Sequence, residues 1–336
     1  MKSVKHILFI LLFAANAKGQ TPFISQSFTA NHFFNPATVG LGSFNKAQSF
    51  FRTQFSGVGQ PYKTVGLGVD FGFLKNDQTE PNNLGFGLQA VSDQVLNGVM
   101  NTNYVTASIA DRVFLNDDRN AFLSLGLGTT IISRTVDMSS LVFGDQYYSG
   151  RLLSPTSMEV LNSYKTQSTI NVGMMYSYNS YTSYFQLGAS SYFINRASGF
   201  NSTDSVRKVT PLNEFNQYLG QLNFEHVIND NKTILIHADY QSRYENDFYY
   251  IGGAVGLPFN ETYDQVSRLY LGLFYRSKDA MVPYIGLMRN KYKFGLTYDI
   301  YSNDLTSANL KPQTFEFTLS TYFGKRRNEG MRSLFD

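Results

Sequence analysis

Hydrophobic and polar residues alternate along most of the chain, and the stretch 291–302 shows this pattern without a break. Successive side chains of a β-strand point to opposite sides, so strict alternation predicts a strand with one apolar and one polar face. Either a protein core or lipid must cover the apolar face. That face carries Tyr292, Phe294, Leu296, Tyr298 and Ile300, and the polar face carries Lys291, Lys293, Gly295, Thr297 and Asp299.

The same alternation recurs in about 14 segments, and no helical periodicity of any length competes with it. Many of these segments approach the length of about ten residues that a tilted strand needs to cross a bilayer. The predicted strands are 44–54, 63–73, 84–95, 101–114, 120–132, 166–178, 181–194, 215–228, 232–243, 247–257, 267–276, 280–288, 291–301 and 313–323.

The connections between the predicted strands are sorted by length. Those after even-numbered strands are often short and made of turn residues, whereas several after odd-numbered strands are long. A membrane barrel has short periplasmic turns and long outer loops, and a soluble sandwich has no reason for such sorting. Three connections, 74–83, 258–266 and 277–279, depart from the rule. The short turns are 116–119, 178–180, 229–231 and 289–290, and the long loops are 133–165, 195–214 and 302–312.

The polar faces are rich in glycine and serine, and only 16% of all residues are charged, below the usual quarter or so. A soluble β-sandwich also alternates, but it normally uses shorter strands, carries more charge outside and has sheet edges to protect. The pattern therefore favours an all-β fold: a transmembrane antiparallel β-barrel of about 14 strands in the outer membrane, spanning residues 44–323.

The two ends of the chain carry separate features. Residues 1–19 are expected to be a signal peptide, because two lysines precede an apolar run and small residues precede Gln20. Its removal takes away three lysines and no acid, so the net charge falls from +3 to 0 and gives no reason to expect nucleic acid. Residues 20–43 are expected to pack at or inside the periplasmic mouth, and 324–336 to form a basic periplasmic tail. Both termini would then be periplasmic.

Residues suited to catalysis or metal binding are sparse. The chain has no cysteine, and its four histidines lack the spacing of metal ligands, so we expect no metal, no cofactor and no catalytic residue. His237 and Asp239 would share a lumen face, where a solvated polar lining is the expected role. A hydrolase would also need a serine and an orienting partner beside the histidine.

Several stretches, in order along the chain, resemble the PorP/SprF family of outer-membrane proteins of the type IX secretion system. They are FNPATVG at 34–40, FRTQFSGVGQPYKT at 51–64, NLGFGLQAVSDQV at 83–95, LYLGLFYR at 269–276 and KFGLTYDIYS at 293–302. Phe55 stands where the family often has tryptophan, and the basic tail after Phe323 is not expected in every member. The motif residues, with structural or partner-binding roles, are Asn35, Pro36, Gly40, Arg52, Gln54, Gly57, Gly59, Pro61, Asp93, Arg276, Tyr298 and Asp299.

The resemblance implies a non-enzymatic outer-membrane barrel that serves protein secretion and gliding motility in Bacteroidota. Its implied partners are a secreted cargo protein with a type IX C-terminal domain of the type B class, other type IX secretion components and outer-membrane lipid. The expected function is binding of a secreted surface protein, a gliding adhesin among the candidates, for export or cell-surface attachment. The alternative is a porin-like or fatty-acid-type solute channel.

The long loops 133–165 and 195–214 offer candidate contacts for such a cargo. Tyrosine rings give contact area at low entropic cost, which suits a binding surface. Alternatively, the loops pack on themselves or fold back into the lumen. The candidate cargo-facing residues are Tyr147, Tyr148, Arg151, Asn201 and Asp204.

Overall fold

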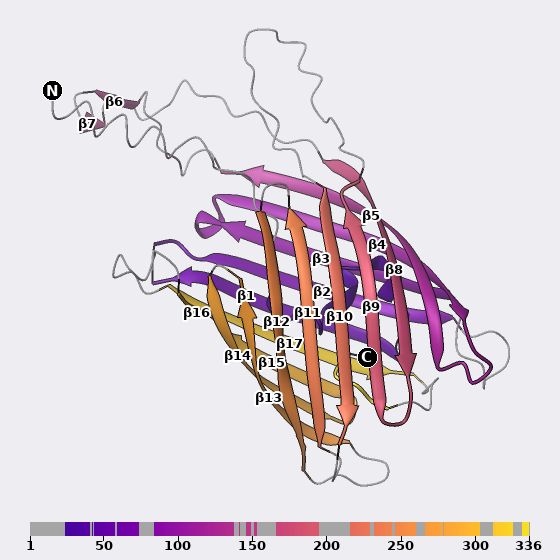
Figure 1. The fold of residues 1–336 in the computed structure, drawn as a ribbon. Helices are drawn as coiled ribbons and strands as arrows, with labels where there is room; N and C mark the ends of the chain where they lie inside the picture. The colour runs from indigo at the N-terminus through magenta and orange to yellow at the C-terminus, as the bar shows by residue number, and fades with distance from the viewer. Residues whose placement is uncertain are drawn as a thin grey trace.

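The structure is a computed structural model in which antiparallel strands form one closed barrel (Figure 1). It describes residues 24–40, 42, 44–57, 59–73, 84–137, 141, 146–148, 151–152, 166–194, 216–228, 232–243, 246–259, 266–277, 279–302, 312–324 and 331–335. Among them no helix is long and apolar enough to cross a membrane.

Fourteen strands make the barrel wall, one of them in two pieces, β15 and β16, that both pair with β14 on either side of Asp299. A separate two-stranded hairpin is formed by β6 (Tyr147–Tyr148) and β7 (Arg151–Leu152). The wall strands are β1 Asn45–Ser56, β2 Tyr62–Phe73, β3 Leu84–Val95, β4 Met100–Phe114, β5 Ala121–Val136, β8 Gln167–Asn179, β9 Ser183–Tyr192, β10 Gln217–Val227, β11 Thr233–Arg243, β12 Asn246–Pro258, β13 Ser267–Arg276, β14 Ala280–Arg289, β15 Tyr292–Tyr298, β16 Ile300–Tyr301 and β17 Gln313–Phe323.

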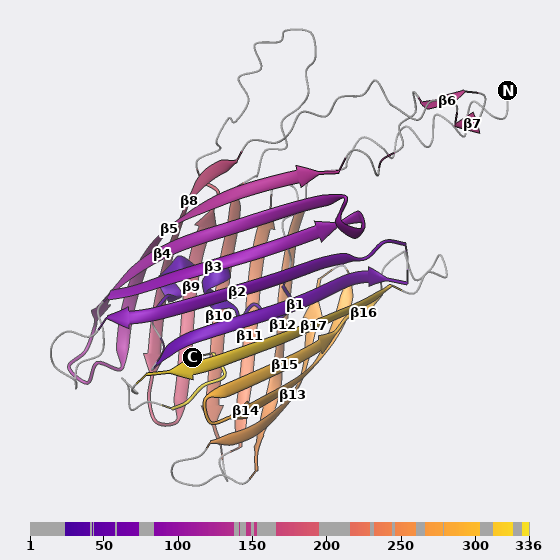
Figure 2. The same cartoon turned by 180° about the vertical axis from the view of Figure 1, so that it is seen from behind.

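Each wall strand pairs with its neighbours in the chain, and the first strand pairs with the last. Phe51 of β1 lies opposite Phe317 of β17, and Leu271 of β13 lies opposite Ile285 of β14. The ring of pairings leaves no open sheet edge, as a span through lipid requires. Figure 2 shows from behind that β1 runs beside β17.

The alternation seen in the sequence sorts side chains between the two faces of the wall. Leu67, Leu127 and Leu296 point outward and expose 61%, 58% and 48% of their surface. Thr297, the next residue after Leu296, points inward and is only 1% exposed. A continuous apolar outer face suits lipid and would be unusual on a soluble protein. This arrangement confirms the predicted transmembrane barrel.

Two chain segments lie inside the barrel. Residues 24–40, called the plug here, contain the 3₁₀ turns η2 (Asn31–Phe33) and η3 (Pro36–Thr38), visible in indigo between the strands of Figure 1. Met331–Phe335, called the tail segment here, enters the lumen as well, and its Ser333, Leu334 and Phe335 are buried. This packing goes beyond the sequence interpretation, which treated residues 324–336 only as a basic tail.

The strand boundaries agree closely with those expected from the pattern. The largest difference is at the end of β5, which runs to Val136 rather than 132 and pairs there with Met100. A third 3₁₀ turn, η4 (Leu96–Gly98), connects β3 and β4.

Candidate functional site

A turn at Asn35 fastens the plug to one side of the wall. Asn35 caps η3, because its Oδ1 accepts a hydrogen bond from the backbone N–H of Ala37 at 3.0 Å. Its Nδ2 donates to the carbonyl of Met174 in β8 at 3.1 Å. The wall comes so close that a Cβ on Gly126 would overlap the backbone of Pro36 and Ala37. The Asn-Pro pair therefore docks onto glycine positions of β5 and β8.

Gly40 ends the plug in a backbone conformation that glycine allows most easily. Its φ is +66°, and its carbonyl accepts a hydrogen bond from Arg112 of β4. A Cβ at this position would lie 2.6 Å from the Cα of Gly85 and 2.7 Å from the carbonyl oxygen of Phe71. The chain can leave the lumen here only because both positions, 40 and 85, lack side chains.

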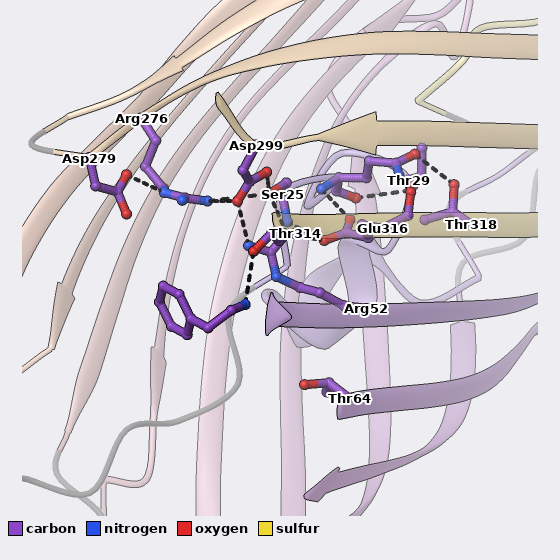
Figure 3. A network of polar contacts seen from close by, with 12 residues as sticks. Ser25, Thr29, Arg52, Thr64, Arg276, Asp279, Asp299, Thr314, Glu316 and Thr318 are labelled. Atoms are coloured by element: carbon purple, nitrogen blue, oxygen red, sulfur yellow. Dashed lines mark hydrogen bonds and ion pairs between the residues drawn. The ribbon is translucent and has the colours of Figure 1, made fainter. Parts of the chain in front are cut away.

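On the opposite part of the wall, Arg52 of β1 organises a buried ion network (Figure 3). Its Nη1 donates to Glu316 Oε2 at 2.9 Å and to Ser25 Oγ of the plug at 2.7 Å. Its Nη2 donates to Asp299 Oδ2 at 2.8 Å. With its amide oriented to match, Gln54 accepts from Nη2 and Nε of Arg52 at 3.0 and 3.2 Å. Every donor direction of the guanidinium is thereby used.

Arg276 approaches the same network from β13. Its Nη1 donates to Asp299 Oδ2 at 2.9 Å, and its Nε donates to Asp279 Oδ1 at 2.6 Å. Asp299 occupies the break between β15 and β16 and is 1% exposed. It therefore accepts from two arginines on different strands, which joins β1, β13 and the β15–β16 strand through side chains.

Glu316 of β17 connects this network to the backbone of the plug. Its Oε2 accepts the N–H of Ser25 and its Oε1 accepts the N–H of Gln26, both at 2.7 Å. The side chain of Gln26 in turn accepts a hydrogen bond from Thr318 at 2.7 Å. Because a carboxylate accepts hydrogen bonds at both oxygens, Glu316 holds two successive plug amides as well as the cation of Arg52.

The charges of this network balance in an environment that water does not reach. The side chains of Arg52, Asp299 and Glu316 are 0% exposed and that of Arg276 is 6% exposed. Two guanidinium groups face two fully buried carboxylates, with the half-exposed Asp279 at the edge. Loss of one partner would leave an uncompensated buried charge, so each member constrains the position of the others.

A second polar cluster grips the middle of the plug. Ser27 Oγ lies 2.9 Å from His237 Nε2 and donates to Asp239, while His237 Nδ1 lies 2.6 Å from Asn223 Oδ1. Serine and histidine thus meet as they do in a hydrolase, but Ser27 and His237 are at most 1% exposed. In this arrangement the cluster fastens the plug to β10 and β11 rather than facing a substrate.

His32 lies on the other side of the plug, within 3.0 Å of the amide nitrogen of Gln48. Burial, together with the positive charge of Lys46, lowers the pKa of His32 to about 3. Asp70 Oδ2 is 3.6 Å from His32 Nδ1, too far for a hydrogen bond, and does not offset the burial. His32 is therefore neutral while the plug is docked.

The tail segment packs inside the lumen next to the plug. The Met331 N–H donates to the carbonyl of Ser180 at 2.7 Å, in the turn between β8 and β9. Phe335 packs edge-on against Phe28 of the plug, with ring centroids 6.0 Å apart, and stacks on Tyr184 at 6.1 Å. Among the described residues, no group of three or more His, Asp or Glu side chains is placed to hold a metal ion.

The chain matches the family described as "Type IX secretion system membrane protein PorP/SprF" over residues 16–321. The chain belongs to the PorP/SprF family. The family is a group of secretion membrane proteins rather than a known enzyme class. A search of curated proteins found no match.

Solved structures share the fold of this PorP/SprF barrel at low sequence identity. The TodX deltaS2S3 mutant, a monoaromatic hydrocarbon channel, has 9% identity and a TM-score of 0.50, with 88% of this chain and 94% of that chain covered. The Ralstonia pickettii toluene transporter TbuX has 12% identity and a TM-score of 0.48 over 88% and 94%. CdiB from Escherichia coli has 12% identity and a TM-score of 0.42, and the match covers 82% of this chain but only 63% of CdiB. At these identities the likeness concerns the fold alone.

The structure brings part of the PorP/SprF motif set together. Arg52, Arg276 and Asp299 form the ion network with Gln54 at its edge, while Asn35, Pro36 and Gly40 fasten the plug. Gly57 and Gly59 adopt φ of +89° and +94° in the connection before Pro61 and β2, so they shape a turn. Two residues lie apart: Asp93 accepts from Thr64 Oγ1 at 2.6 Å, and half-buried Tyr298 packs on Phe315 of the outer face.

The candidate loop residues are only partly described. Tyr147, Tyr148 and Arg151 belong to the β6–β7 hairpin, whose side chains are outside the described part, and Asn201 and Asp204 lie wholly outside it. The sequence analysis missed Ser25 and Glu316 as members of the network. An acid at 316 on a lumen face looks the same in sequence whether water or an arginine faces it.

Proposed function

We propose that this PorP/SprF barrel binds a secreted surface protein with a type IX C-terminal domain of the type B class, for export or attachment to the cell surface. A gliding adhesin is one candidate cargo. The observation that supports docking over conduction is the filling of the lumen by the chain itself. The plug bonds to wall strands on opposite sides, and the tail segment packs beside it. A barrel closed in this way can serve as a platform.

We propose that the cargo is held at the end of the barrel that carries the long connections. Tyr147, Tyr148 and Arg151 of the β6–β7 hairpin would form one part of this surface. Asn201 and Asp204 of the neighbouring long connection complete the candidate surface. Aromatic and arginine side chains commonly dominate binding energy at protein interfaces, which supports this choice.

The proposal requires both termini to be periplasmic and the long connections to face the outside. Short epitope tags within 140–160 or 198–206 should be reached by antibody on intact cells, whereas a tag after Asp336 should be reached only after permeabilisation. A C-terminal tag that is labelled on intact cells would reverse the proposed orientation.

Shortening both 138–165, the part of the first long loop that lies beyond β5, and 195–214 tests the cargo site directly. The barrel ladder closes without these connections, so a folded barrel should accumulate in the membrane at its normal level. A specific surface protein should then appear in the medium instead of on the cell. If the shortened barrel accumulates normally and every surface protein stays in place, cargo docking at these loops is wrong.

The alternative function, a porin-like or fatty-acid-type solute channel, makes a different prediction. An open pore conducts ions in planar bilayers, whereas a barrel whose plug and tail stay docked should show little conductance. Deleting residues 20–40 should raise conductance in either case, which provides the internal control. High conductance of the intact chain would favour the channel.

A further inference from the structure

The tail segment occupies a site inside the barrel, called the groove here, that contacts it largely through its backbone. Glu225 of β10 accepts two hydrogen bonds at one oxygen, from Ser333 Oγ at 2.6 Å and from the backbone N–H of Leu334 at 2.7 Å. Lys293 of β15 donates to the carbonyl of Ser333. The Met331 N–H donates to the turn after β8 at 2.7 Å. Most of these contacts involve the peptide backbone, as is usual for peptide recognition.

The remaining contacts define the side chains that the groove accepts. The Ser333 hydroxyl donates to the carboxylate of Glu225, so this position requires a side chain with a hydrogen-bond donor. Phe335 enters an aromatic site formed by Phe28, Tyr184 and His237, with ring centroids 6.0 to 6.4 Å away. Leu334 lies between them and is 2% exposed. The groove therefore suits a short segment with the order serine, apolar residue, aromatic residue, the last two in a turn.

The barrel wall does not need the tail segment for its own closure. Met331–Phe335 form no strand, and the ladder is completed by the pairing of β17 with β1. When the tail leaves, Glu225 keeps Tyr270 at 2.8 Å and Arg268 at 3.9 Å, both of which approach Oε1. Its Oε2 then loses both donors. A replacement peptide that supplies a hydroxyl and a backbone N–H would restore these two hydrogen bonds.

The occupied groove also supports the plug. Phe335 packs edge-on against Phe28, and Phe28 in turn packs on Phe274 at 5.3 Å and on Tyr284 at 5.4 Å. Departure of the tail would remove one wall of the site that holds Phe28. Tail and plug are thus coupled through a single aromatic cluster.

We propose that this groove is a binding site for a short peptide of the serine–apolar–aromatic type and that the tail segment is its resident, autoinhibitory ligand. A partner protein that presents such a segment at this end of the barrel displaces the tail and loosens the plug. The site goes beyond the proposed function, because it lies at the end opposite the long connections. Residues 325–330 link the tail segment to the barrel. This linkage gives the tail segment an effective concentration of about a millimolar, which favours it over free peptide.

The test uses the full-length barrel in detergent and a fluorescein-labelled peptide with the sequence GMRSLFD of residues 330–336. Phe335→Ala weakens the resident tail while leaving the wall intact. This variant should bind the peptide at least about tenfold more tightly than the wild type, because the cis competitor is weaker. A peptide carrying both Ser333→Ala and Phe335→Ala should not bind.

Two further variants distinguish peptide binding in the groove from non-specific binding. Adding Glu225→Gln to Phe335→Ala should abolish peptide binding, whereas adding Asp117→Asn, the same charge change at an exposed turn, should not. Because the chain lacks cysteine, Ser180→Cys with Met331→Cys can lock the tail by a disulfide, and reductant should restore exchange with the peptide. Barrel integrity is checked by the heat-dependent shift on SDS gels.

For variants that fold, each outcome either supports or overturns the proposal. Failure of the Phe335→Ala barrel to bind the peptide overturns the proposal, as does equal binding by its Glu225→Gln derivative. Equal binding to the disulfide-locked and reduced forms places the peptide elsewhere and also overturns it. If Glu225→Gln prevents folding, the locked and reduced forms still decide the question. Surface location of the cargo is scored separately, so failure here leaves the cargo proposal standing.

Discussion

Replacing Arg52 by methionine tests whether the buried ion network holds the plug. Arg52 donates to Ser25 at 2.7 Å, to Asp299 at 2.8 Å and to Glu316 at 2.9 Å, and its side chain is fully buried. Methionine fills much of the volume but leaves Glu316 without its cation. Breaking a buried pair by removing one partner costs about 3–5 kcal/mol, so the barrel's free energy of unfolding should fall by that amount.

The double variant Arg52→Met/Glu316→Met separates wall stability from plug attachment. Replacing a buried ion pair by apolar residues of similar volume is often neutral or stabilising, so most of the lost stability should return. Plug attachment should not return, because Glu316 accepts the N–H groups of Ser25 and Gln26 at 2.7 Å and methionine accepts neither. Arg289→Met, at the exposed end of β14, is the control and should change stability by less than about 0.5 kcal/mol.

Wall stability and plug attachment are measured separately. Urea unfolding in detergent, monitored by circular dichroism, gives the free energy of unfolding of the barrel. Because the chain has no cysteine and Ala30 is 3% exposed, an Ala30→Cys reporter should react with maleimide only when the plug leaves the lumen. The reasoning is refuted if Arg52→Met costs less than about 1 kcal/mol, the range of an exposed pair, and leaves the reporter unlabelled.

Three further predictions address the outer face, the docking surface and pH. Leu296→Arg should lower the free energy of unfolding by about 2–4 kcal/mol and Ile300→Arg, nearer the strand end, by about 0–1 kcal/mol; equal urea midpoints would contradict a lipid-facing strand. Gly126→Ala should destabilise plug docking by about 1–3 kcal/mol through overlap with the plug backbone, whereas Gly220→Ala, with 4.0 Å of clearance, should not; maleimide labelling of a plug cysteine compares them. His32 has a pKa of about 3 when docked and 6.5 when released, so plug docking is strongest above pH 6.5 and weakens as the pH falls toward 3. At pH 5 the loss should be about 2 kcal/mol, seen as higher bilayer conductance than at pH 7.5, and His32→Gln should remove this pH step.

The sequence by itself determined the barrel wall. Alternation with period two assigns each residue to a face, and one shifted residue would move a whole apolar row from lipid into the lumen. The register therefore follows from which positions are apolar. Leu271 and Leu296, for example, face outward and are 47% and 48% exposed. Because consecutive strands pair, even the neighbours of each strand could be inferred.

The resemblance to known proteins singled out Arg52, Arg276 and Asp299 one at a time. Nothing in their spacing says that they meet, because Arg52 and Asp299 are separated by 247 positions and joined only by closure of the barrel. The sequence pattern did not single out Glu316, since a polar residue on a lumen face is equally expected in a water-filled pore.

Only the tertiary structure decided what fills the lumen. The plug and the tail segment have no repeating pattern, and their bonds run to strands far away in the chain, such as Ser25 to Glu316 across 291 positions. A wall strand is specified locally, since lipid on one side and the lumen on the other act on each residue directly. A lumenal segment is specified by matching donors, acceptors and gaps such as Gly126 that exist only once the barrel has closed.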